Sequence, residues 1–251
     1  MSRIFAFLAG LLVCTVAWAG TVSVSAAISL KEALTEVAGR YQDDTSEKVD
    51  LNFGASGTLA AQIVQGAPVD LFISAANKQV DQLVSAGLAE AGSRRDVAGN
   101  RLVLIVPKDA HGDPKGFEDL REARFRHIAI GQPQVVPAGQ YAMQTFAALG
   151  IEKALADRLF MGENVRQVLV YVMRSEAEAG VVYATDAAAA GEAVRVVAVA
   201  PDSSHDPIVY PAVAIKNGHI ASAQRFLDYL RSPKAQAIFA AHGFTVPEAK
   251  R

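Results

Sequence analysis

The 251-residue sequence contains a single cysteine and almost no net charge. One cysteine cannot close an intramolecular disulfide or supply the thiolates of a zinc site. Lys and Arg number 24 against 26 Asp and Glu, a formal charge of −2, so the basic excess typical of nucleic-acid binding is missing. We therefore expect a globular protein without a nucleic-acid partner, long enough for one large domain or two smaller ones.

The first 19 residues have the pattern of a secretory signal peptide. Arg3 is followed by a short apolar run and then by Ala17-Trp18-Ala19, with small residues two apart before the predicted cleavage point. The run is short for a membrane span, which leaves an N-terminal anchor as the less favoured alternative. Removing residues 1–19 removes Arg3 and Cys14, so the predicted mature chain is periplasmic, has a charge of −3 and contains no cysteine.

The rest of the chain alternates predicted strands with predicted helices. Short apolar runs predict strands at 22–26, 49–53, 70–73, 102–106, 127–130, 181–183, 194–199 and 209–215. Apolar residues three or four apart predict helices at 30–41, 59–65, 79–86, 139–149, 151–160, 165–174, 220–231 and 233–242. This alternation predicts an α/β protein with parallel sheets covered by helices on both faces.

No flexible linker divides the chain, so two lobes would have to share strands as their connections. The segments 102–106 and 194–215 are the candidate crossings. They divide the mature chain into lobe I, residues 20–102 with 210–251, and lobe II, residues 103–209. Ligands in such folds bind beyond the carboxyl ends of the strands, in the crevice.

Two strand-to-helix junctions in lobe I carry serines. Ser29 stands three residues before Glu32, the spacing of a capping box, and Ser56 is the predicted N-cap of the next helix. The glycine on either side of Ser56, at 54 and 57, would let a ligand approach the backbone closely. Capping without any ligand role is the simpler alternative. Two such helix starts after strands of one sheet nevertheless suggest an anion site.

Lobe II contains comparable junctions. Ala138 lies at the start of a helix whose first N–H groups are free, and Val165 begins another helix behind a predicted Asn164 cap. Tyr183 stands at the end of a strand just before a helix. A half-buried ring with its hydroxyl in water is the alternative for this tyrosine.

The sequence gives little support for a known catalytic motif. The five histidines are scattered without metal-ligand spacing. Ser204-His205-Asp206 places triad residue types side by side, but adjacent residues cannot point into one another, and a polar turn is the better interpretation. Ser56 has no evident base. We therefore predict no catalytic residue and no metal bound directly by side chains, with a secreted serine hydrolase using Ser56 as the less favoured alternative.

Seven segments taken together show a resemblance to a known family. They are residues 26–30, 56–63, 66–75, 136–142, 163–166, 180–186 and 239–245. In their order and spacing they resemble the periplasmic molybdate-binding proteins that serve ABC importers, over nearly the whole mature chain. The resemblance implies the type II binding-protein fold, with two α/β lobes that close on a ligand between them.

The resemblance also implies how the ligand is held. The oxyanion would be bound by the hydroxyl and backbone N–H groups of Ser29 and Ser56, the backbone N–H groups of Ala138 and Val165, and the hydroxyl of Tyr183. It further implies a monomer without a cofactor or enzymatic activity, which delivers molybdate or tungstate to the membrane permease of an ABC importer. The metal is held as its oxyanion and not by direct ligation.

The donor set suits such an ion. Molybdate is a tetrahedral dianion without a proton at neutral pH, so a site made only of donors fits it, and helix N-termini can replace Arg or Lys. Tungstate is nearly the same size and should bind comparably. Sulfate or thiosulfate meets the same hydrogen-bond requirement and remains the alternative ligand, distinguished by the size of the cavity.

Overall fold

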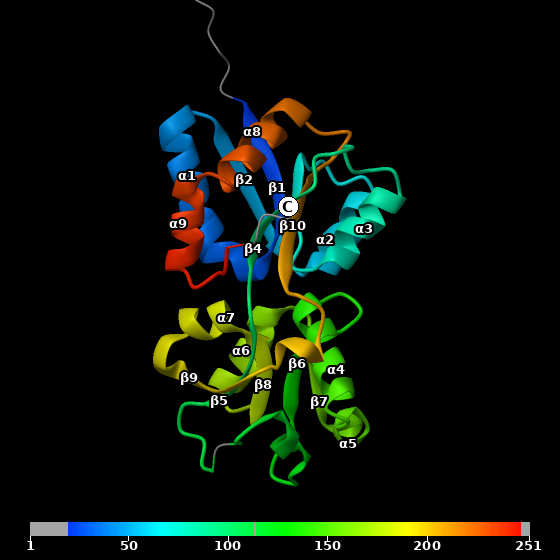
Figure 1. Cartoon of the computed structure of the whole chain (residues 1–251), viewed down its shortest axis with the longest axis vertical. Helices are drawn as coiled ribbons and strands as arrows, with labels where there is room; N and C mark the ends of the chain where they lie inside the picture. Colours follow the sequence, from blue (N-terminus) through cyan, green and yellow to red (C-terminus); the bar gives the residue numbers. More distant parts are fainter. Residues whose placement is uncertain (1–19, 113, 247–251) are drawn as a thin grey trace, which may run out of the picture.

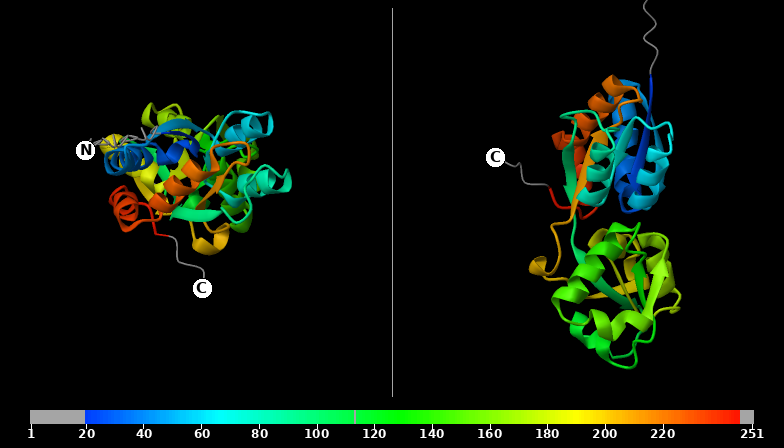
Figure 2. Two further views of the ribbon diagram at one scale, coloured as in Figure 1. Left: turned by 90° about the horizontal axis from the view of Figure 1, so that it is seen from above. Right: turned by 90° about the vertical axis from the view of Figure 1, so that its right-hand side faces the viewer.

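The computed structural model describes residues 20–112 and 114–246, which form two lobes joined by two crossings of the chain (Figures 1 and 2). Each lobe is a five-stranded sheet flanked by helices, which confirms the expected two-lobed α/β fold. The predicted signal segment, with Cys14, lies outside the described residues. Among the helices that are described, none has both the length and the apolar character needed to cross a membrane.

The first lobe contains both ends of the described chain. Its sheet has the order β2-β1-β3-β10-β4. The strands are β1 (Thr21–Ala27), β2 (Lys48–Gly54), β3 (Leu71–Ile73), β4 (Arg95–Gly99) and β10 (Val209–Ala214). The helices are η1 (Ile28–Leu30), α1 (Lys31–Thr45), α2 (Ser56–Val64), α3 (Asn77–Ser85), α8 (Ile220–Leu230) and α9 (Pro233–Ala241). Helices α1, α8 and α9 pack together on one face of the sheet, and α2 and α3 pack together on the other (Figure 1).

The second lobe repeats this architecture with the order β7-β6-β8-β5-β9. The strands are β5 (Leu102–Pro107), β6 (Ile128–Gly131), β7 (Leu159–Gly162), β8 (Ala179–Tyr183) and β9 (Val194–Val199). The α-helices are α4 (Pro137–Ala148), α5 (Glu152–Leu155), α6 (Val165–Met173) and α7 (Ala184–Ala189). Short 3-10 turns are η2 (Phe117–Arg121), η3 (Ala156–Arg158), η4 (Gly191–Ala193) and η5 (Asp202–Ser204).

The sheets are mixed, so the prediction of parallel sheets was correct for only some of the strand pairs. Strand β1 runs parallel to β2 and β3, and β6 runs parallel to β7 and β8. Strand β10 is antiparallel to both of its neighbours, and so is β5. The reason is the connection between lobes, since β5 and β10 each enter their sheet directly from the other lobe.

Two predicted elements need correction, and one strand was not predicted. The chain crosses between the end of β4 and the start of β5, and again between β9 and β10, so the apolar run 102–106 belongs wholly to the second sheet. Strand β4 was not predicted. The single helix predicted for 151–160 is instead the short α5, a 3-10 turn and the edge strand β7. The apolar residues Phe160 and Met161 lie exposed on that edge strand.

The two sheets place corresponding strands at corresponding positions. Strand β1 matches β6, β2 matches β7, and β3 matches β8 in the order of the sheets. Since these strands are parallel within each lobe, their carboxyl ends lie at one edge of each sheet. The segments that follow them therefore come together where the lobes meet (Figures 1 and 2).

A close backbone approach fixes the start of α4. At Gly139 a Cβ atom would overlap the carbonyl oxygen of Gly131, at the end of β6. This glycine therefore lets the first turn of α4 lie directly on the end of the strand. The position of Ala138, one residue earlier, follows from that contact.

Gly139→Ala is expected to destabilise the protein, because the added methyl group collides with backbone that cannot move aside. Overpacking of this kind costs roughly 1–3 kcal/mol of unfolding free energy, measurable by urea denaturation. Gly39→Ala in α1 is the matched control, since a Cβ there meets nothing within 4 Å. A loss no greater than that of the control would show that α4 is not fixed by this contact.

Candidate functional site

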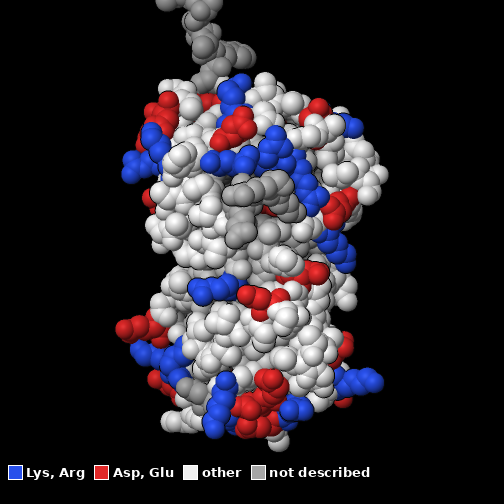
Figure 3. All heavy atoms as spheres, in the orientation of Figure 1, with Lys and Arg blue, Asp and Glu red and all other residues white. Residues whose placement is uncertain are grey.

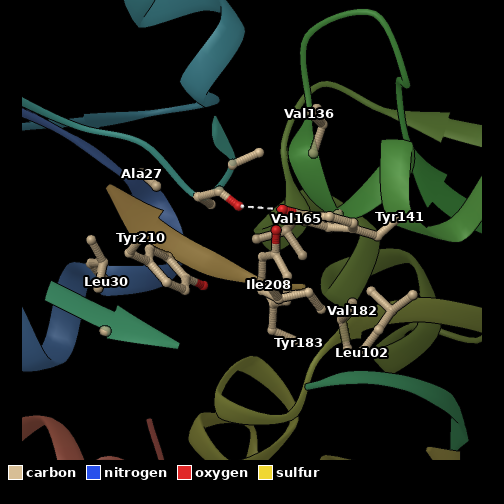
Figure 4. Close-up of a cluster of buried hydrophobic side chains, with 14 of the residues drawn as sticks. Ala27, Leu30, Leu102, Val136, Tyr141, Val165, Val182, Tyr183, Ile208 and Tyr210 are labelled. Atoms are coloured by element: carbon tan, nitrogen blue, oxygen red, sulfur yellow. Dashed lines mark hydrogen bonds between the residues drawn. The ribbon is translucent and has the colours of Figure 1, made fainter. Parts of the chain in front are cut away.

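A small cavity lies where the lobes meet, and all five residues singled out from the sequence line it. Its walls come from the segments after β1, β2 and β3, the starts of α4 and α6, and the end of β8 (Figure 4). The cavity volume is about 10 Å³. The lining residues are Ala27, Ile28, Ser29, Gly54, Ala55, Ser56, Ala75, Val136, Pro137, Ala138, Val165 and Tyr183.

Ser29 lies inside the 3-10 turn η1 and does not cap a helix through its side chain. The predicted capping box was wrong, because this turn occupies the position where the cap was expected. The Ser29 hydroxyl lies 3.0 Å from the hydroxyl of Tyr210, which also accepts a hydrogen bond of 3.1 Å from the Asn100 side-chain amide. When Tyr210 donates to Ser29, the proton of the serine is free for the cavity.

Ser56 is the first residue of α2, and Ala55 occupies the N-cap position, so the predicted serine cap was also wrong. The Ser56 side chain is buried, and its Oγ accepts a hydrogen bond of 3.0 Å from the backbone N–H of Ala75. Because the oxygen already serves as an acceptor there, the hydroxyl proton remains available to a ligand.

Ala138 and Val165 offer backbone N–H groups. Ala138 is the second residue of α4 and Val165 is the first residue of α6. Such positions have no intrahelical acceptor. Asn164 caps α6 as predicted, and its side chain accepts from the N–H of Gln167 at 3.0 Å. The cap therefore uses a later N–H group and leaves that of Val165 free.

Tyr183 ends strand β8 with its hydroxyl buried. The residue is 1 % exposed, and its hydroxyl finds no hydrogen-bond partner within the described part of the chain. The alternative of a half-buried ring with its hydroxyl in water is therefore wrong. Burial, together with Tyr210, Tyr141 and Asp186 nearby, raises the pKa of Tyr183 well above its usual value, so it stays a donor at neutral pH. A buried donor without an acceptor is costly, and a bound anion would satisfy it.

The cavity lining contains no charged side chain. Positive potential comes instead from the N-termini of α2, α4 and α6, each of which carries about half a unit of charge. On the outer surface, Lys and Arg are interspersed with Asp and Glu over both lobes in the view of Figure 3.

A charged cluster lies beside the cavity. Arg166, the residue after Val165, pairs with Glu32 of α1 across the lobe boundary and with Asp186 of α7. Its Nε lies 2.8 Å from Asp186 Oδ1, an ion pair without the alignment of a hydrogen bond. Asp186 is completely buried, and burial raises its pKa to about 7, although Arg166 partly offsets this.

Two further contacts join the lobes next to the cavity. The Tyr141 hydroxyl donates to the carbonyl of Ala75 at 3.4 Å (Figure 4), and the N–H of Gly57 donates to the carbonyl of Val135 at 2.8 Å. Sequence reasoning assigned no role to Tyr141 or to Tyr210. Tyr141 follows Ala138 by three residues on the same helix face, and that spacing could have predicted its place beside the cavity. Tyr210 lies on β10, and no local sequence pattern predicts its contact with Ser29.

The triad residue types at 204–206 lie outside the cavity lining. The Ser204 hydroxyl donates to the carbonyl of Pro201 at 2.6 Å, and His205 Nδ1 lies 2.8 Å from the backbone oxygen of Asp206. These contacts are those of a polar turn. Across residues 20–112 and 114–246, no group of three or more His, Cys, Asp or Glu is arranged to hold a metal ion.

Two lobes with crossing connections around a small donor-lined cavity define a solute-binding protein. The family model described as bacterial extracellular solute-binding protein matches residues 22–245, and the chain belongs to this family. It is 37 % identical to the molybdate-binding protein ModA of Escherichia coli, over 90 % of each chain. It is 38 % identical to ModA of Haemophilus influenzae, over 89 % of each chain.

A solved structure is similar along the same length. The periplasmic molybdate-binding protein of Azotobacter vinelandii superposes with a TM-score of 0.80 and 30 % identity, covering 90 % of this chain and all of that one. The resemblance inferred from the seven sequence segments is thus confirmed.

The buried carboxyl group of Asp186 should make the unfolding free energy depend on pH. Because the folded-state pKa of Asp186 is raised from 3.8 to about 7, its stabilising contribution is complete below pH 3.8 and is lost as the pH rises through 7. Asp186→Asn removes the titrating group. We therefore expect the loss of unfolding free energy between pH 5 and pH 8, measured by urea denaturation without ligand, to be smaller in the variant. Equal losses of unfolding free energy in the wild type and Asp186→Asn would contradict the raised pKa of Asp186.

Proposed function

We propose that this protein binds molybdate in the cavity between its lobes and delivers it to the membrane permease of an ABC importer outside the cytoplasm. Ser29, Ser56, Ala138, Val165 and Tyr183 would hold the oxyanion, as their common cavity supports. The relatives described as molybdate-binding proteins support the choice of ligand. Tungstate would bind in the same way.

The observation that carries this proposal is the buried Tyr183 hydroxyl, a donor without an acceptor in a cavity whose available hydroxyl and N–H protons can serve the same ligand. A tetrahedral dianion accepts at all four oxygens, so it can use donors that come from both lobes. Hydrogen phosphate would turn its own proton toward donors, and a buried group left unpaired costs about 1–3 kcal/mol. The dianion is favoured over the protonated ion for this reason.

The proposal also includes a relative motion of the two lobes. Residues 20–102 with 210–251 and residues 103–209 would move as two lobes about the crossings. The protein would act as a monomer without a cofactor, catalytic activity or nucleic-acid partner. The binding-protein relatives and the uncharged lining are consistent with a carrier that must also release its ligand.

Calorimetry of the mature protein against molybdate, tungstate, sulfate and phosphate tests the ligand directly. We expect molybdate and tungstate to bind with similar affinity, sulfate more weakly and phosphate most weakly. At a ligand concentration 100 times the Kd, molybdate should add about 2.7 kcal/mol to the unfolding free energy. Sulfate binding as tight as molybdate binding would overturn the assignment in favour of another tetrahedral oxyanion.

Two substitutions test the site. Tyr183→Phe and Ser56→Ala should each weaken molybdate binding by about tenfold to a hundredfold, since a hydrogen bond to a charged group contributes about 1.5–3 kcal/mol. Tyr183→Phe should leave the ligand-free unfolding temperature unchanged or higher, because it removes an unpaired buried hydroxyl. Tyr171→Phe on α6, outside the cavity lining, is the control. If both variants bind like the wild type, the site is misplaced.

The hydrolase alternative receives no support at Ser56. Its Oγ accepts from a backbone N–H, and the residues that line the cavity include no His, Asp, Glu or Lys to act as a base. We expect no turnover of an activated ester above background. Turnover that disappears in Ser56→Ala would show otherwise.

A further inference from the structure

Gly57 lies at the point where the backbones of the two lobes touch. It is the second residue of α2, directly after Ser56, and its N–H donates to the carbonyl of Val135 in lobe II. The N···O distance is 2.8 Å. The N–H is one of those that a helix leaves unpaired at its start, so the contact gives it a partner in the other lobe.

This contact leaves no space for a side chain. A Cβ atom at position 57 would lie 2.6 Å from Val135 Cα and 2.7 Å from its carbonyl oxygen, and the three nearest atoms all belong to Val135. The obstacle is backbone, which cannot rotate away as the end of a side chain can. It also comes from lobe II, so it exists only while the lobes are together.

The contact is adjacent to the cavity on both sides. Ser56 precedes Gly57, and Val136 follows Val135; both residues line the cavity (Figure 4 shows Val136). Any change in the separation of residues 57 and 135 therefore moves the Ser56 hydroxyl relative to the donors at the start of α4. The width of the closed cavity depends on this separation.

Two other contacts across the boundary near the cavity are made by side chains and are more adaptable. Arg166 reaches Glu32 through two long side chains, and Tyr141 reaches the carbonyl of Ala75 through its hydroxyl. Side chains of this length can follow a small change in lobe separation by changing rotamer. Two backbones in contact cannot.

We propose that the contact between Gly57 and Val135 is the stop that sets how far the lobes close, and that Gly57 thereby determines the affinity for the oxyanion without touching it through a side chain. This inference rests on the proposed function. A residue at position 57 larger than glycine holds the lobes apart, so a bound tetrahedral anion cannot meet the donors of both lobes at once.

The Gly57→Ala variant distinguishes an effect on lobe closure from an effect on folding. The residue is helical and its φ is not in the left-handed region, so alanine suits the backbone and is the better helix former. Gly39→Ala is the matched control, because Gly39 is also helical and a Cβ there meets nothing within 4 Å. The two variants make the same chemical change, one at the lobe contact and one away from it.

The test combines calorimetry with molybdate, the ligand-free unfolding temperature and small-angle X-ray scattering at saturating molybdate. We expect Gly57→Ala to bind molybdate at least about tenfold more weakly, to unfold at the same or a higher temperature, and to remain less compact than the wild type when saturated. Gly39→Ala should match the wild type in affinity and compactness.

Gly57→Ala that binds as tightly and closes as fully as the wild type overturns the inference while leaving the proposed function intact. A lower ligand-free unfolding temperature of Gly57→Ala also overturns it, because weaker binding would then follow from lost stability. A wild-type protein that does not bind molybdate overturns the proposed function, and with it this inference. The three results are distinguishable in one set of measurements.

Discussion

Ser56 accepts a hydrogen bond from the backbone of Ala75, and the direction of that bond leaves its own proton for the cavity. The same principle applies in the other lobe. Asn164 pairs with the N–H of Gln167, which leaves the earlier N–H of Val165 free. Acceptors near the cavity are thus occupied from outside, so that the groups facing inward can donate. A proton on the ligand would take up a hydroxyl oxygen and turn that hydroxyl's own proton away from the ligand, which makes a fully ionised anion the better occupant.

No charged side chain lines the cavity, but charged residues lie directly beside it. Arg166 lies one residue beyond Val165 and is held between Glu32 of the first lobe and buried Asp186 of the second. Because two carboxyl groups share this guanidinium, its positive charge is largely balanced where it stands. On the proposed function, the dianion is then held by the dipoles of the helix ends, whose effect falls off within about one turn.

Local patterns predicted most of the strands and helices and the junctions that meet at the cavity, because apolar periodicity and strand-end turns are local properties. They failed where a partner lay far along the chain. Ser29 has the spacing of a capping residue, but its hydroxyl is paired with Tyr210 on β10. The antiparallel pairing of β5 and β10 likewise depends on how the chain crosses between lobes. The contact between Gly57 and Val135 exists only in the assembled pair of lobes, and no sequence spacing reports it.

The correspondence of β1 with β6 and of β2 with β7 divides the cavity into two unequal halves. One half holds the two serines, and the other holds Ala138, Val165 and Tyr183. Neither half surrounds a tetrahedral ion by itself. On the proposed function, a permease that draws the lobes apart removes several donors in one movement, with no proton transfer or competing anion required. Unloading would then be a mechanical event, driven by the force applied to the two lobes.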